Sequence, residues 1–231
     1  KEHGREFQQD DIHLLKALSN GAAIAIQNVK YAQRLLQEER IRSELLIAHQ
    51  IQQGILPRPF PPQPGVHFEA LNLPAKVVSG DFYDYFQVSD DEFAFVIGDV
   101  CGKGVPAAIF MASSRSMIKA QAVSNPRPAS VMPLANRLIA QDAQAGMFVT
   151  VLYGLYNTRT RVLSYTNAGH TRPLLLRPST GCCSSLFNAN LPMGMFEHID
   201  FSHVEIEMQK GDMLLLYTDG LTEAMNTAGE C

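Results

Sequence analysis

The sequence lacks the features that mark membrane proteins, secreted proteins and nucleic-acid binders. No apolar run approaches the ~20 residues that a membrane-spanning helix needs, and the first residues are charged, unlike a secretory signal. The 231 residues carry a formal charge of −4, which argues against binding to nucleic acid. Hydrophobic residues make up 46% and charged residues 18%, as in an ordinary globular protein. We therefore predict a cytoplasmic enzyme or regulator with no evident membrane segment.

The sequence also lacks the signatures of a zinc site, a redox site and a nucleotide-binding P-loop. No two of its four cysteines are spaced as C-x-x-C, so free, reduced thiols are expected. A metal ion bound by this chain would then depend on oxygen ligands. Lys103 lies in the run CGKG, but a P-loop needs Ser or Thr directly after its lysine, so nucleotide binding is not expected.

The N-terminal part is free of proline and has a helical pattern. From Gln9 to Leu56, apolar residues recur three and four positions apart, as at Leu15 and Leu18, and after an interruption the pattern resumes at Ile41 and runs through Gln52. This heptad pattern predicts a helix of about 45 residues, roughly 70 Å long. Such a helix cannot bury its own apolar stripe. It either packs on a domain outside this chain or forms a parallel coiled coil in a homodimer.

A proline-rich stretch, LPRPFPPQPG at Leu56–Gly65, ends the helix and marks a domain boundary. Beyond it, apolar residues alternate with a period of two, which predicts half-buried strands in the runs EFAFVIGDV, FVTVLYGLY and HVEIEM. Two helical segments lie between them, at about Pro106–Ala122 and Val131–Ala145. The fold class is therefore α+β, with mostly antiparallel strands and paired helices.

Three acidic turns carry the candidate chemistry. Asp81 in SGDFYD, Asp99 in GDVCGKG and Asp219 in YTDG each lie beside glycine at the end or start of an apolar strand. Hard divalent ions prefer carboxylate and carbonyl oxygens, and aspartates that converge without a cation would repel one another. Turn chemistry explains any single Asp-Gly pair. The three turns together favour a shared metal site.

Five motifs in order resemble those of the bacterial metal-dependent protein phosphatases, a branch of the PPM superfamily typified by the stage II sporulation protein E phosphatase domain. They are SGDFYDYF, FVIGDVCGKGVPAAIFMA, NAGHTRPLLL, PMGMF and GDMLLLYTDGLTEAMN, and the resemblance covers about Ile51–Glu230. The earlier run DDIHLLKALSNGAAIAIQNVKYAQRL resembles the last helix of a GAF sensor domain that continues into a signalling helix.

The resemblance implies an architecture. Residues 1–55 would be the end of a GAF-like domain with its coiled-coil signalling helix, residues 56–65 a linker, and residues 66–231 a phosphatase domain. That domain would be a β-sandwich between helical layers. Family members continue into a further helix, further strands and a final aspartate, so the C-terminal part of the domain is expected to be missing here.

The resemblance also implies roles for individual residues. Asp81, Asp99 and Asp219 match metal ligands, with Asp99 bridging two ions, and Val100 matches a position that offers its backbone carbonyl. Asp84 falls at a second acidic position, where a structural role and ligation are both open. Two Mg²⁺ or Mn²⁺ ions would generate a hydroxide from bound water that attacks phosphorus in line, without a protein nucleophile.

The implied substrate is a regulatory protein of the anti-anti-sigma type, phosphorylated on serine or threonine. One alternative is a catalytically silent, dimeric interaction module with a phosphatase-like fold. Another is a diguanylate cyclase, because SGDF loosely resembles the glycine-rich aspartate turn of that family, but the companion aspartate upstream is lacking. His170 in NAGH is either a general acid or a structural residue of a glycine turn. We further hypothesise that the helix at Ile41–Ile55 regulates the metal site.

Overall fold

The computed structural model describes residues 8–57, 59, 65–74, 77–143 and 146–224. The chain divides into two compact units, Lys1–Ala48 and His49–Cys231. Among the described residues, no helix has both the length and the apolar character needed to cross a bilayer.

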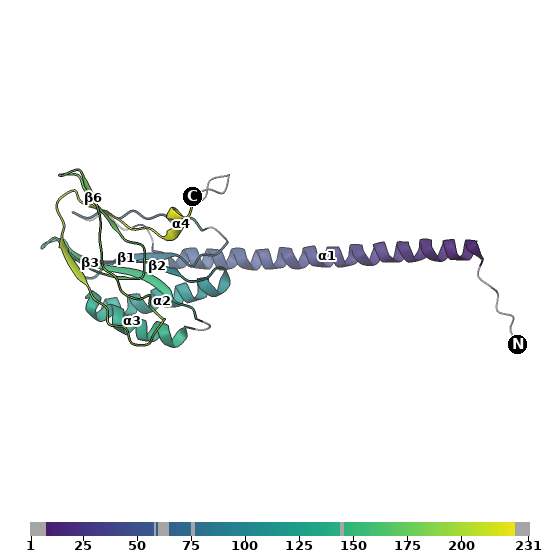
Figure 1. Cartoon of the computed structure of the whole chain (residues 1–231), viewed down its shortest axis with the longest axis horizontal. Coiled ribbons are helices and arrows are strands. Elements are labelled where there is room, and N and C mark those ends of the chain that lie inside the picture. Colours follow the sequence, from purple (N-terminus) through teal and green to yellow (C-terminus); the bar gives the residue numbers. More distant parts are fainter. Residues whose placement is uncertain (1–7, 58, 60–64, 75–76, 144–145, 225–231) are drawn as a thin grey trace. The chain divides into compact units, whose positions relative to one another are not determined.

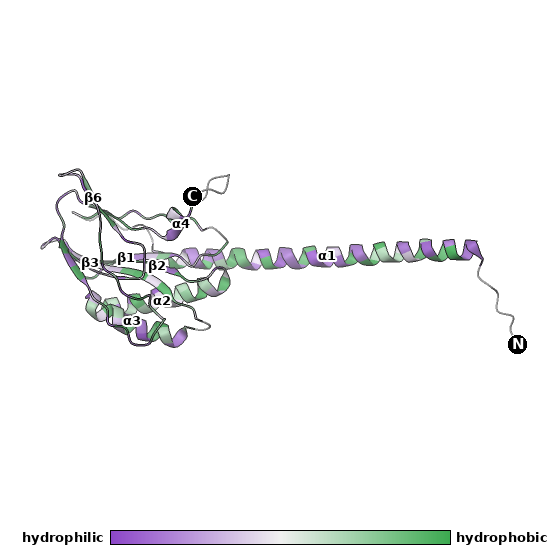
Figure 2. Ribbon diagram, in the orientation of Figure 1, coloured by the Kyte–Doolittle hydropathy of each residue, from purple (hydrophilic) through white to green (hydrophobic). Residues whose placement is uncertain are grey.

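The long N-terminal helix is present as predicted. Helix α1 (Gln9–Ile55) has 47 residues, which corresponds to about 70 Å. Asp10 and Asp11 lie in its first turn, where a negative charge favours the helix dipole. Apolar and polar residues are interspersed along the helix (Figure 2), and in the first unit its apolar side chains are exposed except for the half-buried Leu45 and Ala48. Its pairing in a coiled coil stays a prediction.

The second unit is built on a five-stranded antiparallel sheet with strand order β1-β2-β3-β4-β7 (Figure 1). Its strands are β1 (Phe82–Gln87), β2 (Glu92–Val100), β3 (Val149–Asn157), β4 (Val162–Ala168) and β7 (Val204–Glu207). Three of them match the three strand runs predicted from the alternating pattern.

Two helices, α2 (Val105–Ser124) and α3 (Pro128–Asp142), cover one face of this sheet (Figure 1). Each carries proline in its first turn, where the missing N–H costs no hydrogen bond. The observed α2 matches the predicted segment to within two residues at each end, and α3 begins and ends three residues earlier than predicted. The main core lies between helices and sheet, and the largest fully buried side chains that the helices contribute are Met111, Ile118, Met132 and Ile139.

A second sheet covers the other face of β1–β4 and makes the domain a sandwich. It has the order β6-β5-β8, formed by β5 (Leu174–Arg177), β6 (Cys182–Ser185) and β8 (Met213–Leu215), and the short helix α4 (Asp219–Thr222) follows β8. A smaller apolar cluster around Phe95 and Leu152 fills the space between the sheets, with Leu214 from β8 and Leu216 just after it.

The α+β fold class, with antiparallel sheets flanked by helices, is confirmed. The prediction that all three strand runs are half-buried is wrong for two of them. Strand β2 is buried on both faces along most of its length, and β3 is similar. Both strands are central, with the helix pair on one face and the second sheet on the other. Strand β7, at the sheet edge, alternates as predicted.

Candidate metal centre

The register of β1 and β2 brings two of the predicted ligands together. Phe82 of β1 pairs with Gly98 of β2 in antiparallel fashion, so continuing this register by one residue places Asp81 opposite Asp99. The Asp81 carboxyl group lies close enough to raise the pKa of Asp99. Two carboxyl groups that are far apart in the sequence therefore meet where the two strands begin and end.

Gly98 makes this close approach of strands possible. A Cβ at this position would lie 2.6 Å from the ring of Phe82 and 2.9 Å from the carbonyl oxygen of Thr150. No real side chain tolerates such distances without displacing one of the neighbouring strands. The glycine that precedes Asp99 is thus a packing requirement for the site, in addition to any role in the turn.

The surroundings of Asp99, including the nearby Asp81, disfavour its ionised form. Burial raises the pKa of Asp99 to about 8, and the hydrogen bond and charge of Asp81 and the charge of Asp219 act in the same direction. Only Lys103 opposes the shift, through its positive charge. In the described residues, no lysine or arginine forms an ion pair with these aspartates. Without a cation, Asp99 therefore keeps a proton near neutral pH.

Asp219 reaches the site from the second sheet. It is the first residue of α4, and the preceding Thr218 donates its hydroxyl hydrogen to Oδ2 of Asp81 over 2.9 Å. The charge of Asp219 acts on Asp99, yet among the described residues no group of three or more His, Cys, Asp or Glu side chains is close enough to hold a metal ion. The structure thus joins Asp81 with Asp99 and leaves Asp219 beside this pair.

The donor set of the pair fits a hard divalent cation. Two carboxyl groups that cannot both ionise alone become a favourable ligand pair once a dication replaces the shared proton. The side chain of Val100 is buried in the main core, so any contribution from this residue would come from its backbone carbonyl. The chemistry of the residues therefore agrees with Mg²⁺ or Mn²⁺ at Asp81 and Asp99.

Asp84 lies elsewhere, on the helix side of the sheet. It is three residues beyond Asp81 along the strand, and side chains separated by an odd number point to opposite faces. Its fully buried carboxylate accepts from Arg115 at 2.6 Å and Lys119 at 3.0 Å, both on α2. These ion pairs favour the structural role for Asp84. The signal for them was in the sequence, because Arg115 and Lys119 share one helix face at i, i+4 spacing.

His170 is buried near the acidic pair. Its side chain is 9% exposed, and its Nδ1 lies 2.9 Å from the Thr150 hydroxyl. Burial lowers the pKa of His170 to about 4, although the charges of Asp81 and Asp219 and the Tyr217 carbonyl act in the opposite direction. The imidazole is therefore neutral near pH 7 and holds no extra proton to give to a leaving group.

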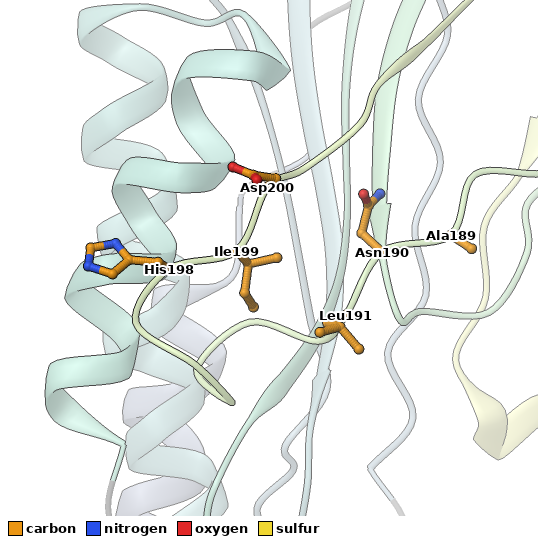
Figure 3. A pocket seen from close by; sticks show the side chains of 6 residues that line it. All are labelled: Ala189, Asn190, Leu191, His198, Ile199 and Asp200. Carbon is orange, nitrogen blue, oxygen red and sulfur yellow. The ribbon is translucent and has the colours of Figure 1, made fainter.

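A network of amide side chains fixes the turn that carries His170. Asn167 accepts from the His170 backbone N–H at 2.7 Å and donates to its carbonyl at 3.0 Å. Asn190 in turn donates to the carbonyl of Asn167 at 3.1 Å. Asn190 also borders an open hollow of about 500 Å³ (Figure 3), whose lining residues are Ala189, Asn190, Leu191, His198, Ile199 and Asp200. None of the candidate ligands lines this hollow, so it is a separate feature from the acidic pair.

Gln52, near the end of α1, is a further residue that the sequence reasoning missed. Its buried side-chain amide donates to the Ser79 carbonyl at 2.8 Å and accepts from the Ser79 N–H at 3.0 Å. Ser79 also accepts, through its hydroxyl, from the N–H of Asp81 at 3.0 Å. The helix end is therefore bonded to the segment that leads into the acidic pair. A glutamine in the apolar heptad pattern was the available signal.

Comparison with known proteins relates the chain to bacterial phosphatases. Residues 89–231 match the family described as Stage II sporulation protein E. The phosphoserine phosphatase RsbU of Bacillus subtilis is 30% identical over 192 residues, which cover 83% of this chain and 57% of RsbU. The chain thus spans little more than half the length of this relative.

Solved structures share the fold. The SiaA-PP2C domain of Pseudomonas aeruginosa superposes with a TM-score of 0.68 at 21% identity, over 84% of this chain and 78% of that domain. RsbX, in a complex with magnesium, gives a TM-score of 0.52 at 21% identity, over 65% of this chain and 71% of RsbX. At these identities the similarity concerns the fold alone, and it agrees with the sandwich described above.

Proposed function

The chain belongs to the stage II sporulation protein E family of phosphatase domains, and from this premise we propose that it hydrolyses phosphoserine or phosphothreonine on a regulatory protein. The observation that carries the proposal is the contact between Asp81 and Asp99, with the pKa of Asp99 raised to about 8. Perturbed carboxyl groups of this kind are typical of sites built for a cation or a proton.

Asp81, Asp99 and Asp219, with the backbone carbonyl of Val100, would hold two Mg²⁺ or Mn²⁺ ions. The ions would supply Lewis acidity, lower the pKa of a water molecule and offset the charge of the phosphate. The chain's own contribution is to keep the ligands in place. The Thr218 hydroxyl orients the Asp81 carboxylate, and the paired strands β1, β2 and β3 keep Asp99 from moving.

The substrate we propose is a phosphorylated protein of the anti-anti-sigma type. Support comes from the similarity to RsbU, which is named a phosphoserine phosphatase. For the rest of the chain, we propose that residues 1–55 are the end of a GAF-like sensor with its signalling helix. Residues 56–65 would be a linker, and residues 66–231 would be the phosphatase domain. Two copies would pair through the exposed apolar residues of α1.

The deciding experiment is a phosphatase assay on the full-length protein with Mn²⁺ and a phosphoserine protein substrate. Asp99→Asn should lower kcat at least about 100-fold. Mutation of a residue that only supports a metal ligand typically lowers activity about 10–100-fold, and Asp99 would bind the metal directly. Asp90→Asn is the control, since Asp90 is an exposed residue before β2. Equal rates for wild type and Asp99→Asn would reject the hydrolytic mechanism and favour a silent interaction module.

A further inference from the structure

The Thr150 hydroxyl lies between His170 and the backbone of Asp99. It donates to the Asp99 carbonyl oxygen at 3.3 Å, and it lies 2.9 Å from Nδ1 of His170. A hydroxyl has one hydrogen to donate. If that hydrogen goes to the carbonyl, the contact with His170 requires Nδ1 to carry a proton and donate to the hydroxyl oxygen.

The other ring nitrogen of His170 is consistent with this tautomer. Nε2 is buried and has no hydrogen-bond partner. The Tyr217 carbonyl is near enough to act on the pKa of His170, but no hydrogen bond of normal geometry joins it to Nε2. That carbonyl already accepts from the Thr171 hydroxyl. A neutral imidazole protonated on Nδ1 therefore satisfies the contacts best.

The peptide unit between Asp99 and Val100 is held at both edges. Its carbonyl accepts from the Thr150 hydroxyl, and its N–H donates to the Gly80 carbonyl at 3.4 Å. Rotation of this unit would change ψ of Asp99 and φ of Val100 and would break both contacts. The two contacts therefore fix the peptide that joins Asp99 to Val100.

The backbone of His170 is held in place by several contacts. Its backbone is bonded twice to the Asn167 side chain. The preceding Gly169 has φ 72°, and a Cβ there would lie 2.6 Å from the ring of Pro192. The turn that carries the imidazole therefore has little conformational freedom.

From these contacts we propose that His170 is a positioning residue: it holds the Thr150 hydroxyl against the Asp99 carbonyl and so fixes the peptide that joins the two proposed metal-binding positions, Asp99 and Val100. The inference rests on the proposed function, which supplies the metal ion. The role of His170 itself is argued from the contacts of the Thr150 hydroxyl. In this role His170 acts through its Nδ1 proton.

Paired substitutions in the full-length protein test the contacts that link His170 to the Asp99 carbonyl through the Thr150 hydroxyl. Thr150→Val removes the hydroxyl while keeping the shape, and Thr150→Ser keeps it. His170→Asn places an amide N–H near the position of Nδ1, whereas His170→Gln places it near Nε2. Mn²⁺ affinity measured by calorimetry should fall about 10–100-fold in Thr150→Val and His170→Gln. It should stay within about threefold of wild type in the Ser and Asn variants, and His203→Asn, at an exposed histidine, serves as the control.

Two readouts by NMR need neither metal nor activity. The ¹⁵N shifts of His170 should show a protonated Nδ1 and an unprotonated Nε2, and Thr150→Val should move the backbone amide signals of Asp99 and Val100. An unprotonated Nδ1, or unmoved signals in Thr150→Val, would overturn the inference. Wild-type protein that binds no Mn²⁺ would instead count against the proposed function, and the NMR result would still decide the role of His170.

Discussion

The raised pKa of Asp99 predicts that metal binding depends steeply on pH. Below about pH 8 the metal-free carboxyl pair keeps a proton, and a divalent cation must displace it to bind. Well below this value each pH unit should weaken the apparent Mn²⁺ affinity about tenfold, and lowering the pH from 8 to 6 should weaken it about 50-fold, because the group is already half protonated at pH 8. Above about pH 8 the affinity should level off.

The stability of the metal-free protein should change in the opposite direction. The pKa of Asp99 is above its ordinary value of 3.8 in the folded protein, so folding takes up a proton between these two pH values. The contribution of Asp99 to stability is therefore fully present below about pH 4 and is lost as the pH rises to about 8. Saturating Mn²⁺ should flatten this slope, because the metal-bound folded protein has lost the proton of Asp99 and folding then takes up no proton in this range.

The assay is a thermal melt of the full-length protein from pH 5.5 to 8.5, in EDTA and in Mn²⁺, with calorimetric titration at each pH. Asp99→Asn removes the titrating carboxyl group and should flatten the stability slope in EDTA. It should also weaken binding at every pH. A wild-type Mn²⁺ affinity that does not change between pH 6 and pH 8 would refute the reasoning, because no proton would then compete at the pair.

Three further substitutions test packing and polar contacts of the second unit by urea denaturation. Asp84→Asn leaves two cations without their anion, and we expect a loss of about 3–5 kcal/mol in the free energy of unfolding. Gln52→Ala removes both hydrogen bonds to Ser79, so a loss of about 1–3 kcal/mol is expected, with weaker Mn²⁺ binding as well. Gly154→Ala would place a Cβ 2.3 Å from the ring of Phe95, and the overpacking should cost about 1–3 kcal/mol.

Each of these changes has a matched control in the chain. Asp90→Asn and Gln53→Ala alter exposed residues of the same kinds, and both should change the stability by less than about 0.5 kcal/mol. Gly21→Ala lies in an exposed part of α1 with open space around the Cβ, and it should be neutral or slightly stabilising. A control that loses as much stability as its partner would show that the named contact is not the cause.

The sequence predicted those features that depend on local pattern. The heptad spacing indicated α1, alternation indicated β2, β3 and β7, and two helical segments were predicted within three residues of the observed bounds of α2 and α3. Asp81 and Asp99 stood out because glycine and an apolar strand accompany each of them. Their proximity followed from the family resemblance, and the strand register provides the physical reason for it.

Other features depend on tertiary contacts and left little trace in the sequence. Thr150 looks like any β-branched residue of a strand, and its importance comes from the carbonyl and imidazole that flank its hydroxyl. The burial of β2 on both faces depends on a second sheet contributed by residues far along the chain. Gln52 was visible as a polar residue in an apolar pattern, but its partner Ser79 could not be read from spacing.

The buried cluster of one carboxylate and two cations has a consequence for how this sequence can vary. Lys119 is 38% exposed, so its replacement by an uncharged residue still leaves Asp84 neutralised by Arg115, and water can take over part of its role. Replacement of Asp84 leaves two positive charges without a partner. Among natural variants of this domain we therefore expect lysine to be lost first and aspartate last. Because Asp81 directly precedes the strand that carries Asp84, loss of Asp84 would also disturb the strand next to the metal centre.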